Sequence, residues 1–283
     1  EVGLPERIWR YLEEDNLAGK LDATKKYLLF GKPASLKSGG GYTYKTRDYE
    51  IQNFQFVPFQ VKTTGHPDEI FFPENLWPSN ENGTRGTRYE PGFLPFNTNK
   101  FDAQVENIAL YASNEFGITT SLKAILGLRM ESYKQYYTAI NQGGLSLNKE
   151  VVLDNLDLFP SVNLIYALSD IQNLRFSYSR TVARPSFKEA SFAQIFDPLT
   201  GRIFIGGFSE DVDQVTGEVF WDGNLTASKI DNLDLRWEIF QKRGQTFSLG
   251  GFYKTFDRPI EIVQYVIAPN NFQPRNVGDG KAI

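Results

Sequence analysis

The chain has 283 residues, a net charge of −4 and no cysteine. The acidic balance argues against nucleic acid as the main partner, and the lack of cysteine excludes disulfide scaffolds, cysteine zinc sites and thiol nucleophiles. Aromatic residues make up 14% of the chain although its mean hydropathy is only −0.38. No run of 18 apolar residues is present that could form a transmembrane helix. A chain that is aromatic yet polar is typical of a transmembrane β-barrel, in which half of each strand is polar.

The chain begins with a segment that predicts a short helix over 5–16. Pro5 suits the first turn of a helix, and Glu6 favours its positive end. Three apolar side chains would share one side of this helix: Ile8, Tyr11 and Leu12. We expect a helix within a loop, packed on the surface of the protein, and the alternative is a helix that binds a partner.

Extended segments follow the predicted helix. Strands are expected over 17–30 and 36–57, with a turn at 31–35 between them. Residues 58–100 fit no period, and prolines recur through them. An irregular stretch of this length is unusual inside a compact domain, so it predicts a long functional loop.

The middle of the chain predicts two strands, over 101–116 and 122–137, joined by a short turn at 117–121. A glycine-containing loop at 141–148 follows. The second strand alternates between an apolar face and a polar one. The apolar residues are Leu122, Ala124, Leu126, Leu128 and Met130, and the other face carries Lys123, Gly127, Arg129 and Glu131.

The stretch 158–189 contains two runs of about ten residues that predict an antiparallel hairpin with a polar turn at 169–173. Val162, Leu164, Tyr166 and Leu168 share one face of its first strand, and Leu174, Phe176 and Tyr178 share one face of its second. In a soluble sandwich this apolar face would meet a second sheet, whereas in an outer-membrane barrel it would meet lipid.

The last third of the chain repeats the pattern. A second irregular stretch covers 185–224, and strands are expected over 225–241 and 246–267 around a turn at 242–245. Residues 276–283 resemble the start of another strand. Alternation is sharpest where Leu233, Leu235, Trp237 and Ile239 are interleaved with Asp234, Arg236 and Glu238.

The connections alternate in length, and this alternation predicts the fold class. The turns are four or five residues long, whereas the loops 58–100 and 185–224 are about forty. Short turns at one end of a sheet and long loops at the other are characteristic of outer-membrane barrels. The sequence therefore predicts an all-β, antiparallel transmembrane β-barrel segment of about eight strands.

Several segments resemble the barrel of TonB-dependent outer-membrane receptors, in the style of those from Bacteroidetes-type bacteria. They are Gly127–Glu131, Phe159–Tyr166, Leu174–Arg180, Ala183–Glu189 and Gly251–Asp257. The resemblance implies a 22-stranded barrel with an N-terminal plug, of which residues 1–283 would supply a part without the plug or the closing strands. It implies short periplasmic turns, long extracellular loops, and TonB-driven import of a ferric siderophore, glycan or peptide.

The residues that could support catalysis or metal binding do not form a recognisable site. His66 is the single histidine, no G-x-S-x-G elbow is present, and an H-E-x-x-H motif is impossible. The acidic run 210–218 departs from the EF-hand template, which favours a solvated loop over a calcium site. We therefore expect neither an enzyme nor a cofactor.

Two groups of residues are candidates for function. Charged residues expected to face the lumen, where they would form ion pairs with neighbouring strands or a plug, or contact ligand, are Arg129, Glu131, Arg175, Asp234, Arg236 and Glu238. Loop aromatics that would either stack on a ligand or pack the loops together are Phe71, Phe72, Trp77, Tyr89, Phe93, Phe96, Phe192, Phe196, Phe204, Phe208, Phe220 and Trp221.

The expected partners are outer-membrane lipid, TonB acting through the plug, and the imported nutrient, and a surface lipoprotein is a further candidate. Two rival functions share part of the evidence. A barrel with a structural or secretion role would have the same strands, and a soluble β-rich carbohydrate-binding module would bury the apolar faces against a second sheet.

Overall fold

The computed structural model describes residues 4–78, 82–92, 95–197, 199–241 and 244–283. Its main feature is one antiparallel sheet in which eight long strands follow each other in chain order. They are β1 (Glu6–Leu29), β2 (Lys32–Phe59), β4 (Lys100–Gly117), β5 (Leu122–Ile140), β6 (Ser146–Ser169), β7 (Gln172–Ala183), β12 (Ser228–Phe240) and β13 (Thr246–Asp257). The predicted all-β antiparallel fold is confirmed.

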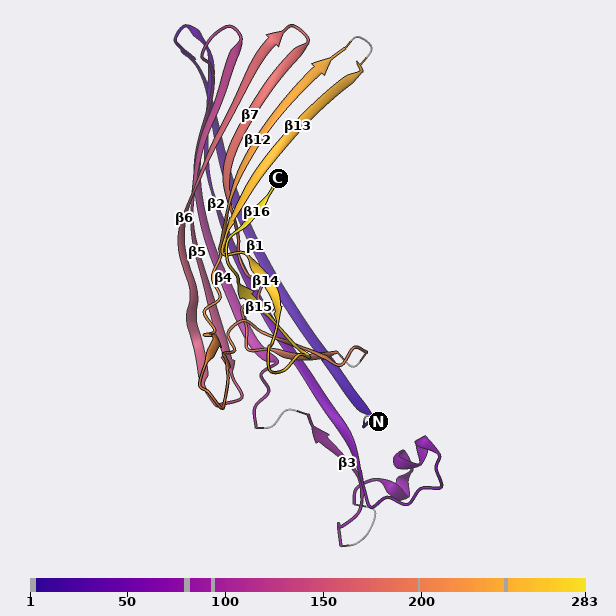
Figure 1. Cartoon of the computed structure of the whole chain (residues 1–283). Helices are drawn as coiled ribbons and strands as arrows, with labels where there is room; N and C mark the ends of the chain where they lie inside the picture. Colours follow the sequence, from indigo (N-terminus) through magenta and orange to yellow (C-terminus); the bar gives the residue numbers. More distant parts are fainter. Residues whose placement is uncertain (1–3, 79–81, 93–94, 198, 242–243) are drawn as a thin grey trace.

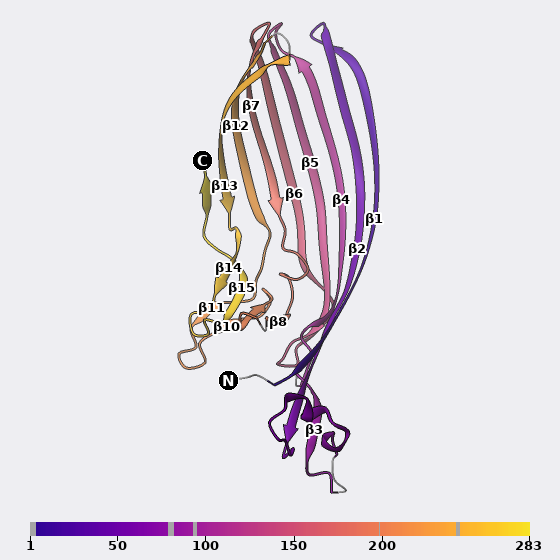
Figure 2. The same cartoon turned by 90° about the vertical axis from the view of Figure 1, so that its right-hand side faces the viewer.

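The sheet bends into a curved wall with tight turns at one end and loops at the other (Figures 1 and 2). Residues 30–31, 118–121 and 170–171 connect strands at the turn end, close to the predicted turns. Within the described residues, β1 pairs with β2 alone, while β13 pairs with β12 and with a short strand, β16 (Gly280–Ala282). The long loops lie at the opposite end, which we call the loop end.

Short elements occupy the two long loops. The first loop holds two 3-10 helices, η1 (Pro67–Phe71) and η2 (Pro73–Asn75), and a strand, β3 (Gly86–Pro91), that pairs with β2. The second holds β8 (Gln194–Asp197), β9 (Arg202–Ile205), β10 (Asp211–Val212) and β11 (Val219–Trp221). No helix in the described ranges has the length and apolar character needed to cross a membrane.

The helix predicted over 5–16 is wrong, because these residues form the first half of β1. Glu6 pairs with Gln55 of β2 and Asn16 pairs with Lys45, in an unbroken antiparallel register. Side chains therefore alternate between the two faces of the sheet, with Ile8 and Tyr11 on opposite faces. Pairing with a strand about fifty residues later decides this conformation, and a local helical pattern cannot reveal it.

The predicted strand 246–267 is also corrected, since β13 ends at Asp257. Arg258 has a backbone φ of 49°, in the left-handed region that non-glycine residues rarely adopt. After this turn, β14 (Ile260–Gln264) leaves the main sheet and pairs with β15 (Asn271–Asn276). These strands form a four-stranded sheet with β8 and β9, in the order β14-β15-β9-β8.

The two faces of the main sheet differ in chemistry. We call the face that carries Arg129 and Tyr137 the inner face, and the face that carries Leu128 and Leu235 the outer face. The outer face has an apolar band across the strands, made by exposed side chains such as Leu17, Leu21, Ile108, Leu110, Leu126, Leu128, Leu156, Leu158, Leu233, Leu235 and Leu249. Exposed apolar side chains in this arrangement match the lipid-facing band of a transmembrane barrel.

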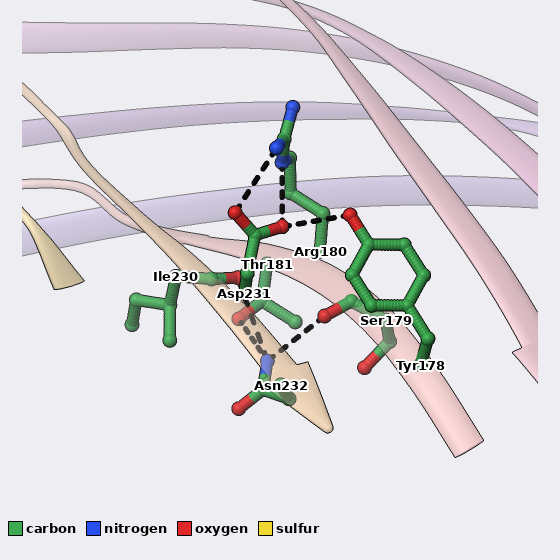
Figure 3. Close-up of polar contacts among 7 residues, drawn as sticks. All are labelled: Tyr178, Ser179, Arg180, Thr181, Ile230, Asp231 and Asn232. Carbon is green, nitrogen blue, oxygen red and sulfur yellow. Dashed lines mark hydrogen bonds and ion pairs between the residues drawn. The ribbon is translucent and has the colours of Figure 1, made fainter. Parts of the chain in front are cut away.

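Charged residues replace the band toward the loop end of the outer face. Asp231 on β12 accepts hydrogen bonds from the Tyr178 hydroxyl at 2.8 Å and from Arg180 at 2.9 and 3.0 Å, as Figure 3 shows. The next residue, Asn232, points to the other side of the strands and contacts Ser179 and Thr181. On β7 and β12 the apolar band thus ends at one tyrosine and one ion pair, as expected where a barrel leaves the bilayer.

A buried cluster of hydrophobic side chains lies on the inner face at the loop end. Phe101 and Tyr137, from β4 and β5, pack against Phe187 and Phe192 of the second long loop. Tyr137 is completely buried, and its hydroxyl oxygen accepts a hydrogen bond from the Phe192 amide at 3.0 Å. The second loop is therefore packed against the inner face of the sheet at its loop end.

Candidate ligand-binding vestibule

A cavity of about 430 Å³ opens on the inner face at the loop end, between the wall and the second loop. We call it the vestibule pocket. Its wall side comes from β1 and β2, and its loop side comes from β8 and β9. The lining residues are Glu6, Ile8, Arg10, Ile51, Asn53, Gln55, Gly92, Asn99, Gln142, Gln194, Ile195, Phe196 and Ile203.

The pocket's loop side is fixed to the wall by a pair of amide hydrogen bonds. Asn99, which is fully buried before β4, donates from Nδ2 to the Gln194 carbonyl at 2.7 Å. Its Oδ1 accepts from the Gln194 amide at 2.8 Å. The Asn99 side chain thus satisfies both the amide and the carbonyl group of Gln194, and these two hydrogen bonds hold β8 against the wall.

Both apolar and polar groups line the pocket. Ile8, Ile51 and Phe196 provide apolar surface, whereas the amides and one guanidinium group provide directed donors and acceptors. Glu6 is already engaged, because its carboxylate accepts from Gln55 at 2.9 Å and from Asn53 at 3.4 Å. A concave, partly apolar site with a few converging polar groups is the usual form of a small-molecule site.

Below the buried aromatic cluster, the inner face carries a group of charges. Arg184, just after β7, contacts Glu131 of β5 at 2.8 Å and Asp157 of β6 at 2.9 Å. Arg129 adds a second contact to Glu131 at 2.7 Å. The Arg184 guanidinium also lies 4.3 Å from the centre of the Tyr133 ring, so it is held by both charge and aromatic stacking.

A second charged group lies farther toward the turn end on the same face. Glu238 contacts Arg175 at 2.6 Å and Arg236 at 3.2 Å. These residues and Asp234 line another cavity, of about 580 Å³. All six charged residues predicted to face the lumen therefore share the inner face. Their packing with a plug or ligand stays a prediction.

The aromatics of the first loop form a partly exposed cluster on β2 and β3. Phe56 packs against Tyr89 at 5.0 Å and against Phe71 at 5.1 Å between ring centres. Phe72 and Trp77 are exposed, and the Arg88 guanidinium lies 4.3 Å from the Trp77 ring. Phe96 is half-buried, and Phe93 lies outside the described residues. Ligand contact by this group stays a prediction.

The aromatics of the second loop divide by position. Phe192 and Phe208 pack on Tyr137 within the buried cluster. Trp221 donates from Nε1 to the Gly207 carbonyl at 2.8 Å, and Phe220 beside it is half-buried. Packing is therefore the observed role of Phe192, Phe208 and Trp221. Phe196 lines the vestibule pocket, and Phe204 lies beneath Lys188.

The acidic run 210–218 is tied into the second loop. Asp211 pairs with Arg275 of β15, and both side chains are buried. Asp213 accepts from the Val215 and Thr216 amides at 2.7 and 3.2 Å, and these hydrogen bonds lower the pKa of its carboxyl group. His66 is exposed near Asp68. In the described ranges, no three His, Cys, Asp or Glu side chains are grouped to hold a metal ion.

Sequence reasoning missed the polar residues of the vestibule pocket, above all Arg10 and Asn53 on the wall side and Gln194 on the loop side. The helical interpretation of 5–16 concealed Arg10, which shares one face of the strand with Ile8 and Leu12. Gln194 carried no signal, because its position depends on the fold of a long loop. These three residues come from segments up to 184 positions apart.

The comparisons with known proteins give one consistent result. The family model described as "TonB dependent receptor-like, beta-barrel" matches residues 9–282. A search of curated proteins finds no significant match. The ferric citrate transporter FecA in its unliganded form is 13% identical, with a TM-score of 0.56 over 99% of this chain and 32% of that one.

Two further solved structures have the same fold. The ferric-catecholate import receptor Fiu from E. coli is 12% identical, with a TM-score of 0.52 over 95% of this chain and 34% of that one. The ferripyoverdine receptor of Pseudomonas aeruginosa is 14% identical, with a TM-score of 0.52 over 96% of this chain and 30% of that one. The chain therefore spans about a third of the length of these receptors.

Proposed function

Because the chain belongs to the TonB-dependent receptor β-barrel family of the outer membrane, we propose that it forms the wall and ligand vestibule of a nutrient importer. The loop end then faces the cell exterior and the turn end faces the periplasm. The nutrient is a ferric siderophore, a glycan or a peptide. It is captured at the loop end, and TonB supplies the energy for its passage by acting on a plug domain inside the barrel.

The vestibule pocket is the observation that carries this proposal. Its volume of about 430 Å³ lies within the range of about 300–1,000 Å³ that is typical of small-molecule sites. The pocket lies at the loop end of the sheet, and the second long loop forms one side of it. A barrel with a purely structural role needs no such cavity. Ferric chelates are the first class to test, because the similarly folded receptors Fiu, FecA and the ferripyoverdine receptor are named for them.

The test is uptake by cells that carry or lack the whole receptor. Radiolabelled ferric chelates, oligosaccharides and peptides would be offered at low concentration, with TonB present and absent. We expect uptake of one class to depend on both the receptor and TonB. Uptake of every class that is unchanged on deletion of the receptor would contradict the proposal.

A pocket-filling variant links uptake to the vestibule. Ile8→Trp places a large side chain in the pocket from β1, whereas Tyr11→Trp enlarges the same strand on its outer face. We expect Ile8→Trp to reduce uptake at least tenfold and Tyr11→Trp to leave it unchanged. Equal uptake by both variants would remove the vestibule pocket from the transport route.

A further inference from the structure

Among the described residues, Arg10 in the wall of the vestibule pocket has no ion-pair partner. It lies on the inner face of β1, opposite Ile51, and no carboxylate of the described residues approaches it within the 4.0 Å of an ion pair. The neighbouring cations differ, because Lys45 and Arg47 both pair with Glu14. Arg10 is thus left available to a group that enters the pocket.

Lys188 provides a second positive charge near Arg10. Its ammonium group lies 4.2 Å from the centre of the Phe204 ring, and it likewise forms no ion pair in the described part of the chain. Burial and then the charge of Arg10 lower the pKa of Lys188. Two cations close enough to affect each other repel, and an anion between them would offset that repulsion.

The nearby carboxylates are occupied by other donors. Glu6 accepts from Gln55 and Asn53, and Glu189 accepts from the Ser186 amide at 2.7 Å. Asp197 accepts from the Leu199 amide at 3.0 Å and from the Thr200 hydroxyl at 2.6 Å. None of the three forms an ion-pair contact with Arg10, and the charge of Arg10 is the last of the causes that lower the pKa of Asp197, after the hydrogen bonds from Thr200 and Leu199.

We propose that the vestibule pocket binds a ligand that carries a carboxylate-type oxyanion, and that Arg10 is the residue that binds this group. A guanidinium group matches a planar oxyanion with two parallel hydrogen bonds. Lys188 adds a long-range attraction from the loop side. The amides of Asn53 and Gln194 contact neutral oxygens of the ligand, and Phe196 contacts its apolar part. This inference rests on the proposed function and names the chemistry of its ligand.

The test measures binding to the whole receptor, purified in detergent, with two matched pairs of probes. Iron(III) citrate is compared with a neutral iron(III) tris(hydroxamate), and digalacturonate with neutral galactobiose. The pairs separate a ferric chelate from an acidic glycan as the source of the oxyanion. In one pair at least, we expect the anionic probe to bind more tightly than the neutral one.

The variants locate the binding group. Arg10→Gln should weaken binding of that anionic probe by about tenfold or more, the effect expected for loss of a charge-assisted bidentate contact. Arg10→Lys should retain part of the affinity, and Lys188→Gln should weaken it by about threefold. Arg7→Gln is the matched control, because Arg7 lies on the outer face of the same strand, against Trp9. It should leave affinity unchanged.

Three outcomes would overturn the inference. Preference for neutral probes, with Arg10→Gln binding them as well as the unaltered receptor, would reject the oxyanion but leave nutrient import standing. Binding of an anionic probe that is equal in Arg10→Gln and Arg7→Gln would reject Arg10 as the binding group. Failure of both anionic probes to bind would also reject it, and the uptake experiment decides separately whether import itself fails.

Discussion

Two arginines form ion pairs on opposite faces of the same sheet, and their surroundings differ. On the inner face, the Arg184 side chain is 15% exposed, between Glu131 and Asp157 at 11% and 8%. On the outer face, Arg180 and Asp231 are 41% and 33% exposed (Figure 3). The contact distances are nearly equal, so burial and not geometry sets their importance for stability.

The difference in exposure between Arg184 and Arg180 has a structural cause. The second long loop, which begins just after Arg184, folds onto the inner face, whereas Arg180 lies on the outer face, where it is more exposed. Removing the buried arginine would leave Asp157 without its charge partner in a water-poor site, and would leave Glu131 with Arg129 alone. Removing the exposed one would leave a carboxylate that water can solvate.

The largest expected effect is that of Arg184→Ala. It should lower the free energy of unfolding by about 3–5 kcal/mol, the usual cost of breaking a buried ion pair from one side. Urea-induced unfolding of the receptor in lipid vesicles would measure this change. Arg129→Ala is the control, since Arg129 is 42% exposed and Glu131 keeps Arg184. Equal effects from the two variants would contradict the role of burial.

A smaller effect is expected at the aromatic cluster that holds the loop down. Tyr137→Phe keeps the ring but removes the oxygen that accepts from the Phe192 amide. The buried amide would then have no partner, at a cost of about 1–3 kcal/mol. Limited proteolysis of the second loop, alongside vesicle unfolding, would detect it. An unchanged cleavage rate would show that this hydrogen bond does not anchor the loop.

For the outer-face pair we expect at most about 1 kcal/mol, because the pair is partly solvated. A double-mutant cycle with Arg180→Ala and Asp231→Ala measures the coupling directly. The same cycle on Arg184 and Asp157 should give a clearly larger coupling. Equal coupling energies in the two pairs would contradict the conclusion that burial makes the inner pair stronger.

The smallest expected effect concerns Glu69 in the first loop. Protonation of its carboxylate should destabilise this loop without unfolding the sheet. Hydrogen bonds from the Thr64 side chain and amide lower the pKa of Glu69 from its usual 4.5. A lowered folded pKa means that the stabilisation is present above the unfolded pKa and is lost as the pH falls through the folded value. Proteolysis of residues 62–75 should therefore accelerate in acid below about pH 4.

Glu69→Gln should remove that pH dependence, because its side chain does not titrate. Glu74→Gln is the matched control in the same loop and should keep it. A pH dependence that survives in Glu69→Gln would assign the acid sensitivity to another group.

Much of the fold could be predicted because strand alternation is a local property. Residues 122–137 and 228–240 show which side chains face lipid and which face inward, and the structure agrees. The positions of the short turns follow from glycine and polar residues. Arg129, Glu131, Arg175 and Glu238 could be placed on one face in this way, since a period of two fixes the face of every residue in a strand.

What the sequence determined by itself is therefore the class of fold, the faces of the central strands and the family resemblance. Tertiary structure alone decided that residues 6–16 extend β1, that β14 leaves the sheet after Arg258, and that the second loop folds inward. It also decided which residues form the vestibule pocket, where Arg10, Asn53 and Gln194 meet. Each of these depends on contacts between segments far apart in the chain, and no local pattern of residues encodes such contacts.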